Sequence, residues 1–171
     1  MSFETIFIQW IKDYEKLIRH LIIGFEAKSA IQDELYQEIT LNIWRALSKF
    51  RQDASAKTFV ARIAHNVLAT HVAKSVRTVK TDRDIDSIVD TDHEKASTDA
   101  TPYQALTQQQ RQQCLLRAIR QLTLEQQQVI TLALEGMSYQ EVAETLSITT
   151  NLVGVRLQRA KAALAKLLEA S

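Results

Sequence analysis

The chain has 171 residues, enough for one domain or two small ones, and contains only 3 Gly and 1 Pro. So few helix breakers, with plentiful Ala, Leu, Ile and Gln, predict an all-α protein. A single cysteine, Cys114, excludes a disulfide framework and a cysteine-based metal site, and the net charge of +1 conceals charges that are segregated along the chain.

An apolar stripe repeats every three or four residues over 3–23 and predicts a first helix that ends near Gly24. Such a stripe indicates core packing, so we give it no chemical role. Polar residues such as Glu4 and Asp13 interrupt the stretch. We therefore expect no signal peptide, no membrane span and a cytoplasmic location.

A second helix is predicted over 29–47, with Ser29 and Gln32 forming a capping box at its start. Its expected buried edge is Ile31, Leu35, Ile39, Ile43 and Leu47. The opposite face mixes acids and Gln, with Leu41 and Trp44 nearby. Acids near a helix start can be purely structural, but a face that combines them with a large aromatic is typical of a protein interface.

A third helix is predicted over 56–76, after a polar loop that ends in a Ser cap. No acid occurs between Asp53 and Asp82, whereas the bases of this segment are Lys57, Arg62, Lys74, Arg77 and Lys80. Surface lysines are often only solvated, but so long a stretch without acids favours phosphate binding.

From 81 to 102 acids dominate without an apolar period, and Pro102 closes the run. This composition predicts a flexible acidic linker between two helical domains. An alternative is that the linker mimics nucleic acid inside a basic channel.

The second domain is predicted to begin with a helix over 103–122. Thr123 would cap a helix over 124–135 that ends at Gly136 and buries Val129, Ile130, Leu132, Ala133 and Leu134.

Two short amphipathic runs follow and predict a helix-turn-helix. Ser138 and Glu141 form a capping box for the first helix, and Thr150 or Asn151 would cap the second. The second helix meets no acid until Glu169, and its bases are Arg156, Arg159, Lys161 and Lys166. Such a surface suits the phosphates of a major groove, although an ordinary helical hairpin would also fit.

Several blocks together resemble, in order, those of bacterial sigma factors: residues 34–38 with 44–47, then 59–66, 135–143 and 156–161. The chain is most similar to the short extracytoplasmic-function group. The resemblance implies a core-polymerase and minus-ten domain over 1–80, a linker over 81–102, and a minus-thirty-five domain with the helix-turn-helix over 103–171.

The resemblance also implies site residues. Those expected to dock on core RNA polymerase are Glu34, Gln37, Glu38, Thr40 and Trp44. Those expected at the melted minus-ten element, where a base of the non-template strand is flipped out, are Arg51, Asp53, Ser55, Lys57, Arg62, His65, Asn66, Lys74 and Arg77. Those expected on duplex minus-thirty-five DNA are Thr150, Asn151, Val155, Arg156, Gln158 and Arg159.

The chain departs from the family pattern at three positions of the helix-turn-helix. Ser147 stands where Gly is frequent, and positive φ at a non-Gly residue costs on the order of 1 kcal/mol. Gly154 and Val155 replace a basic and a hydroxyl residue. Methyl contacts from Val155 and polar contacts from Gln158 and Arg159 are then what remain for reading bases.

The expected function is that of a dissociable specificity subunit of RNA polymerase, with no catalytic residue, no cofactor and no metal. No nucleotide-binding, metalloprotease or nucleophile signature occurs in the sequence. The resemblance further implies an anti-sigma partner. Two alternatives stay open: a stand-alone helix-turn-helix regulator, and a helical adaptor without a DNA role.

Overall fold

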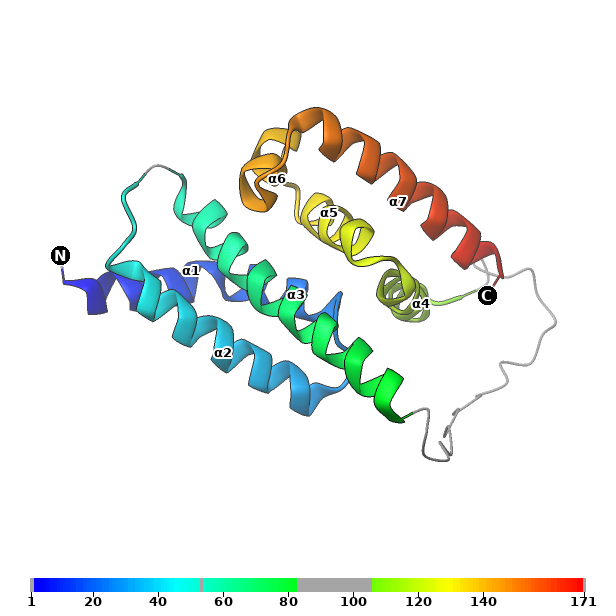
Figure 1. The fold of residues 1–171 in the computed structure, drawn as a ribbon, viewed down its shortest axis with the longest axis horizontal. Coiled ribbons are helices and arrows are strands. Elements are labelled where there is room, and N and C mark those ends of the chain that lie inside the picture. Colours follow the sequence, from blue (N-terminus) through cyan, green and yellow to red (C-terminus); the bar gives the residue numbers. More distant parts are fainter. Residues whose placement is uncertain (1, 53, 83–105, 171) are drawn as a thin grey trace.

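The computed structural model describes residues 2–52, 54–82 and 106–170, without the side chains of 77–82. These residues form only helices, as predicted: α1 (Phe3–Ile23), α2 (Ser29–Leu47), α3 (Ala56–Asp82), α4 (Gln108–Gln121), α5 (Leu124–Leu134), α6 (Tyr139–Leu146) and α7 (Thr150–Ala170). Helices α1 to α3 form one unit, and α4 to α7 form a second that packs on it (Figure 1). Apart from the end of α3, the predicted linker over 81–102 lies outside the described residues.

The first unit is a three-helix bundle around a continuous apolar core. Ile18, Ile39, Ile43 and Leu68 are completely buried in it. The four-residue spacing along α2 that predicted its inner edge puts Leu35, Ile39, Ile43 and Leu47 on one side, and each such side chain contributes roughly 1.5–3 kcal/mol. None of the described helices is both long and apolar enough to cross a bilayer.

The start of α2 differs from the prediction. Lys28, not Ser29, is the N-cap residue, and it has no side-chain capping bond. Glu26 holds the chain before the helix instead, because its carboxylate accepts the Lys28 amide at 3.1 Å and its carbonyl accepts Gln32 Nε2 at 2.7 Å. The predicted Ser cap of α3 is confirmed, since Ser55 Oγ accepts the Thr58 amide at 3.1 Å.

In the second unit the predicted cap at Thr123 and the predicted capping box at Ser138 are both present, and Thr123 also forms a capping box, with Gln126. The predicted start of α4 at 103 is wrong. The helix begins at Gln108, because Thr107 and Gln110 form a capping box there.

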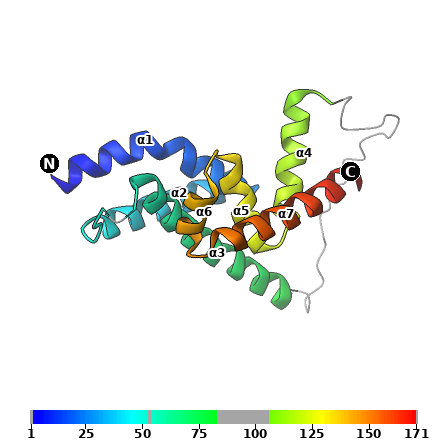
Figure 2. The same ribbon diagram turned by 90° about the horizontal axis from the view of Figure 1, so that it is seen from above.

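Helix α5 lies at the centre of the molecule, between α7 and the first unit (Figure 2). It is therefore buried on several sides, and its buried residues include the polar Gln127 and Thr131 as well as Val129 and Leu132. The expectation that Leu134 is inside is wrong. Leu134 is 56% exposed and lines an open hollow beside the end of α1.

Two left-handed residues end helices in the second unit. Gly136 has φ 78° after α5, and Ser147 has φ 57° at the end of α6, where the sequence led us to expect positive φ. We expect Ser147→Gly to raise the free energy of unfolding by about 1 kcal/mol in urea titrations, because glycine adopts this conformation without a Cβ penalty.

Gly136→Ala provides the opposite control. A Cβ at this position would meet nothing within 4 Å, so its cost would come from the backbone conformation alone. We expect a loss of about 1 kcal/mol. If neither Ser147→Gly nor Gly136→Ala changed the free energy of unfolding, the proposed backbone strain at positive φ would be contradicted.

Candidate protein and nucleic-acid interfaces

The outer face of α2 carries the residues predicted to bind polymerase. Glu34, Gln37 and Glu38 are exposed, Thr40 is half-buried, and Trp44 is 45% exposed. They lie opposite the buried edge of the helix. The Trp44 ring is held by an edge contact with Phe7 of α1, with centroids 5.2 Å apart, so its orientation is set before any partner binds.

The structure adds apolar residues from α1 to this face, and the sequence analysis missed them. Phe3 and Ile8 are 56% and 61% exposed, and Leu41 of α2 is 46% exposed. Ile8 and Leu41 line an open hollow of about 660 Å³ together with Glu4, Phe7, Thr40 and Trp44, whereas Phe3 lines a different hollow. Ile8 lies outside the predicted apolar stripe of its helix, and that was the available signal. Ile8, Leu41 and Trp44 are called the apolar patch below.

An aromatic cluster holds the loop between α2 and α3. The Phe50 and Phe59 rings are tilted against each other with centroids 4.8 Å apart, and the Trp10 ring makes edge contacts with them at 5.0 and 5.7 Å. Beside it lies a hollow of about 470 Å³, lined by Phe3, Ile6, Trp10, Leu47, Phe50, Gln52, Ala54 and Ala56. An aromatic-walled hollow next to exposed Arg51 has the chemistry needed to stack an unpaired base.

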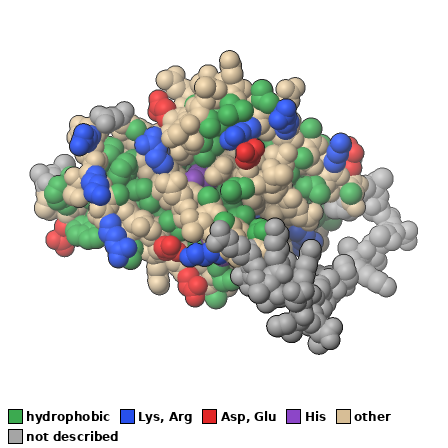
Figure 3. Space-filling view, viewed as in Figure 1, with side chains coloured by type: hydrophobic (Ala, Val, Ile, Leu, Met, Phe, Trp, Pro, Cys, Tyr) green, Lys and Arg blue, Asp and Glu red, His purple; other side chains and the backbone are tan. Residues whose placement is uncertain are grey.

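The bases predicted for minus-ten DNA do not form one stripe on α3. Lys57, Arg62 and Lys74 are not spaced by three or four residues, so they point in different directions. Lys57 and Arg62 are half-buried and Lys74 is exposed. On the face shown in Figure 3, Lys and Arg side chains are likewise spread singly. Asp53 and the Arg77 side chain lie outside the described residues.

Arg62 is already engaged within the molecule. Its Nη2 donates to the backbone carbonyl of Glu144, at the end of α6, at 2.7 Å. Asn66 follows one turn later and is exposed, in a groove between α2 and α3 that it shares with Glu38 and Asn42. Two predicted interfaces, one for protein and one for DNA, therefore meet in this groove.

His65 is not at the surface, contrary to what a direct DNA contact requires. The side chain is 2% exposed and packs edge-on against Phe25, with centroids 5.6 Å apart. Neither ring nitrogen has a hydrogen-bond partner. Burial lowers the pKa of His65 to about 4, so the ring is neutral at physiological pH.

This buried ring predicts how stability depends on pH. Because the pKa of His65 falls from 6.5 to about 4 on folding, the unfolded chain takes up a proton in that range and the folded chain does not. The contribution of the neutral His65 ring to the free energy of unfolding is therefore fully present above pH 6.5. It decreases by about 3 kcal/mol as the pH falls towards 4. Urea titrations of the wild type and His65→Leu at several pH values test this. The variant should lack this slope, and equal slopes would contradict the assignment.

The helix-turn-helix forms as predicted. Val142 and Ala143 of α6 pack against Val153, Leu157 and Ala160 of α7 within the core of the second unit. The capping prediction for α7 is wrong by one residue, because Thr149 Oγ1 accepts the Leu152 amide at 3.1 Å. Thr150 and Asn151 are thereby left exposed in the first turn with no capping role.

The outer face of α7 is only partly cationic. Arg159 and Gln158 are exposed and Val155 is 43% exposed, whereas Arg156 pairs with Glu125 of α5 at 3.4 Å. Gly154 presents no side chain to a ligand, and a Cβ there would lie 3.5 Å from the Tyr139 ring. Bases facing this helix would therefore meet Asn151, Val155 and Gln158 rather than a row of charges.

Two family matches cover most of the chain. Residues 10–78 match Sigma-70 region 2, and residues 112–164 match Sigma-70, region 4. The chain is 28% identical over 159 residues to the RNA polymerase sigma-H factor of Pseudomonas aeruginosa, covering 91% of this chain and 82% of that protein. It is 26% identical over 155 residues to the ECF RNA polymerase sigma-E factor of Escherichia coli, covering 88% and 80%.

Solved structures share the fold. One is the sigma factor RpoE in complex with the anti-sigma factor NepR from Bartonella quintana, with a TM-score of 0.70, 20% identity, and coverage of 95% of this chain and 96% of that one. Another is CnrH in complex with the cytosolic domain of CnrY, with a TM-score of 0.65, 21% identity, and coverage of 98% and 90%.

Proposed function

The chain belongs to the extracytoplasmic-function group of the sigma-70 family and is an RNA polymerase sigma factor, and from this premise we propose how its surfaces are divided between core polymerase and promoter DNA. The observation that carries the division is the position of the outer face of α2. It is exposed and mixed in chemistry, and it borders the DNA-binding helix α3 only along the groove that Glu38 shares with Asn66.

Core polymerase binds the outer face of α2 through Glu34, Gln37, Glu38, Thr40 and Trp44. The apolar patch extends this interface onto α1, because Ile8 and Leu41 lie beside Trp44 and would be desolvated with it. A central aromatic and aliphatic anchor with acids around it has the composition of a binding hot spot. The acids select a partner surface of positive potential.

The minus-ten element meets the start of α3 and the preceding loop. Arg51, Ser55, Lys57, Arg62, Asn66 and Lys74 are retained as contacts to the unwound strand, and Asp53 and Arg77 remain proposed from the family resemblance. The aromatic-walled hollow beside Phe50 supports a site for the flipped base, because stacking offsets part of the few kcal/mol that extrusion costs. His65 is omitted as a direct contact and supports α3 from within the core.

The minus-thirty-five element meets the first turns of α7. Thr150 and Arg159 bind phosphates, while Asn151 and Gln158 can pair with the N6 and N7 edge of adenine and Val155 can contact a thymine methyl. Arg156 retains a role in holding α7 against α5 and becomes a DNA contact only if it leaves Glu125. This chemistry favours A·T pairs in the centre of the element.

An anti-sigma factor is a further proposed partner, in line with the complexes named for the two solved structures. The protein acts in the cytoplasm with its polymerase and performs no covalent chemistry.

Reconstitution with core polymerase on a promoter library tests the proposal. The holoenzyme should select promoters with two elements, whereas the free chain should bind the same duplexes at least about a hundredfold more weakly, near the level of non-specific binding. Equally tight, specific duplex binding by the free chain would instead support a stand-alone regulator. Absence of binding in both cases would support an adaptor without a DNA role.

A further inference from the structure

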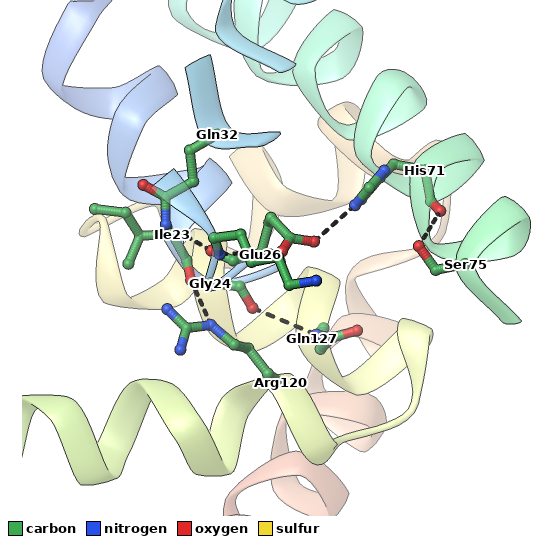
Figure 4. Close-up of polar contacts among 9 residues, drawn as sticks. Ile23, Gly24, Glu26, Gln32, His71, Ser75, Arg120 and Gln127 are labelled. Carbon is green, nitrogen blue, oxygen red and sulfur yellow. Dashed lines mark hydrogen bonds and ion pairs between the residues drawn. The ribbon is translucent and has the colours of Figure 1, made fainter. Parts of the chain in front are cut away.

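The second helix of the helix-turn-helix lies on the far side of its unit. That unit is fastened to the end of α1 through α4 and α5, where Arg120 Nε donates to the Ile23 carbonyl at 3.0 Å and Gln127 Nε2 donates to the Gly24 carbonyl at 3.3 Å (Figure 4). Helix α7 packs on α4, α5 and α6, on the side of α5 that is turned away from the first unit (Figure 1). Its outer face is therefore open to a partner as large as a DNA duplex.

Two of the 3 glycines in the chain are explained by the protein itself. A Cβ on Gly24 would lie 2.6 Å from Thr131 Cγ2, so close packing of the end of α1 on α5 excludes a side chain there. Gly136 has φ 78°, a conformation that glycine adopts without the penalty of a Cβ. The third glycine, Gly154, therefore needs a separate explanation.

Neither of these reasons applies to Gly154. It lies inside α7, where glycine is less favourable than alanine, and its φ is not positive. Beyond its own turn of helix, a Cβ there would meet only Tyr139 Cε2 in the described part of the chain, at 3.5 Å, which is an ordinary van der Waals distance. The fold would accept alanine at this position. The missing side chain thus leaves a gap on the outside of the helix-turn-helix that the packing of the protein does not require.

Tyr139 forms one wall of this gap. It is the first residue of α6 and is 51% exposed. The capping box of Ser138 and Glu141 fixes the backbone on both sides of Tyr139, with bonds of 3.2 and 3.3 Å. Its ring lies beside Gly154, and its hydroxyl has no hydrogen-bond partner among the described residues. A positioned aromatic ring with a free hydroxyl therefore stands at the edge of the second helix.

The apolar surface continues from this gap across the outer side of α7. Leu152 and Val155 are both exposed, and their spacing of three residues makes them neighbours on the helix surface. Val153 takes the buried side of the helix, so Val155 points outward. Tyr139, the bare backbone at Gly154, and Val155 thus follow one another across the part of a helix-turn-helix that meets a major groove.

The major groove offers one apolar group that fits such a surface. Thymine presents its C5-methyl group there, whereas the other three bases present only hydrogen-bonding groups. In a helix-turn-helix the N-terminal part of the second helix contacts base edges, and the first helix crosses the backbone. A methyl group in the groove would therefore meet the gap at Gly154 with the Tyr139 ring beside it, and a phosphate would lie near the Tyr139 hydroxyl.

We propose that Tyr139 and Gly154 form a site for a 5-methylpyrimidine in the minus-thirty-five element, next to the base pair whose methyl group contacts Val155. The inference rests on the proposed binding of that element by α7, and it adds a specificity-determining residue from α6. The methyl group occupies the space left by the missing side chain, and the Tyr139 hydroxyl donates to a neighbouring phosphate. Two adjoining base pairs are then recognised by their methyl groups.

Uracil tests the proposal, because it differs from thymine only by the missing methyl group. Holoenzyme is titrated with the duplex element selected from the promoter library, in which each thymine of either strand is replaced by uracil in turn. At two neighbouring base pairs the replacement should weaken binding about threefold to fourfold, the factor expected from one buried methyl group. Weaker binding at only one base pair, or at none, would overturn the proposal.

Substitutions assign the two base pairs to their side chains. Tyr139→Ala should abolish the effect of uracil at one base pair, and Val155→Ala should abolish it at the other. Tyr139→Phe keeps the ring, so it should retain the effect of uracil at both. It should weaken binding equally for all sequences, because only a phosphate contact is lost. A Tyr139→Ala protein that responded to uracil like the wild type would remove Tyr139 from the site.

Gly154→Ala separates recognition of DNA from a structural role of the contact with Tyr139. Alanine fits beside the ring and favours the helix, so the midpoint of urea unfolding should rise. The new methyl group of the protein fills the gap, so the effect of uracil at the Tyr139 base pair should disappear. A lower urea midpoint would show that the glycine serves packing within the protein. Either that result or a full effect of uracil in the variant would overturn the proposal.

The base that carries the methyl group is identified with 5-methylcytosine. A C·G pair at the Tyr139 position should bind more weakly than T·A, and 5-methylcytosine should recover about threefold to fourfold over cytosine. A gain of that size supports a 5-methylpyrimidine site, and tighter binding of thymine than of 5-methylcytosine assigns thymine as its base. No gain from the added methyl group would contradict the site.

The proposed function is tested separately with Arg159→Glu. If this variant kept full promoter binding in the holoenzyme, the assignment of the minus-thirty-five element to α7 would fail, whatever uracil does. If Arg159→Glu lost promoter binding while uracil and Gly154→Ala had no effect, that assignment would stand and recognition of the methyl group would fail.

Discussion

Replacing Trp44 with Ala should weaken binding of core polymerase about thirtyfold, equivalent to about 2 kcal/mol. The ring is 45% exposed yet oriented by Phe7, so a partner would bury it without first having to order it. It lies outside the buried core of the first unit, so the free energy of unfolding should change by less than about 1 kcal/mol. Titration of labelled protein with core polymerase measures the affinity, and urea unfolding measures the stability.

Leu134→Ala is the matched control for this substitution. Leu134 is 56% exposed, on α5, away from the outer face of α2. The Leu134→Ala substitution should leave the affinity for core polymerase unchanged. Glu38→Lys should weaken binding about tenfold, with an effect that shrinks as salt is raised. The proposed α2 interface would be contradicted if Trp44→Ala and Glu38→Lys both bound polymerase within about twofold of the wild-type affinity.

Arg159→Glu should reduce binding of the holoenzyme to a promoter with a minus-thirty-five element by at least about tenfold. The side chain is exposed on α7 and has no ion-pair partner among the described residues, so reversal places a negative charge next to DNA phosphates without breaking a contact in the protein. Electrophoretic mobility shift with holoenzyme and duplex promoter measures the loss. Affinity for core polymerase should remain unchanged.

Arg117→Glu makes the same change of charge at an exposed position of α4 and should have little effect on promoter binding. An equal loss in both variants would indicate a non-specific charge effect. Gln158→Ala adds a test of base reading. It should relax selectivity at one base pair, at a cost of about 1–3 kcal/mol for the preferred sequence, without altering the salt dependence.

Most helices could be predicted because their signals are local. Apolar spacing gave the bounds of α1 and α2, and the capping boxes at Thr123 and Ser138 form between residues three apart. The errors arose where another residue competed for the same role. At the start of α2 the Glu26 carbonyl binds Gln32 Nε2, so Gln32 forms no capping box with Ser29, and at the start of α7 Thr149 displaced Thr150 and Asn151.

The site residues were predicted unevenly. Exposed polar positions such as Glu38 and Arg159 could be placed from helical period, because one side of each helix is clearly apolar. Leu41 was placed beside this face, but Ile8 was missed, because the first helix was given only a core-packing role and Ile8 lies outside its apolar stripe. His65 was misplaced for the opposite reason: a titratable side chain is expected at the surface, yet it packs against Phe25.

By itself the sequence determined the helical class, the caps, the helix-turn-helix and the family, because each depends on residues a few positions apart or on the order of short blocks. Only the tertiary structure decided that α5 and α6 cover α3 and the end of α1, and that Gly24, Thr131, Arg120 and Arg62 meet there. Such contacts join residues far apart in the chain, and their strength depends on the shape and carbonyl directions of two finished helical units. No periodicity in either unit encodes that match.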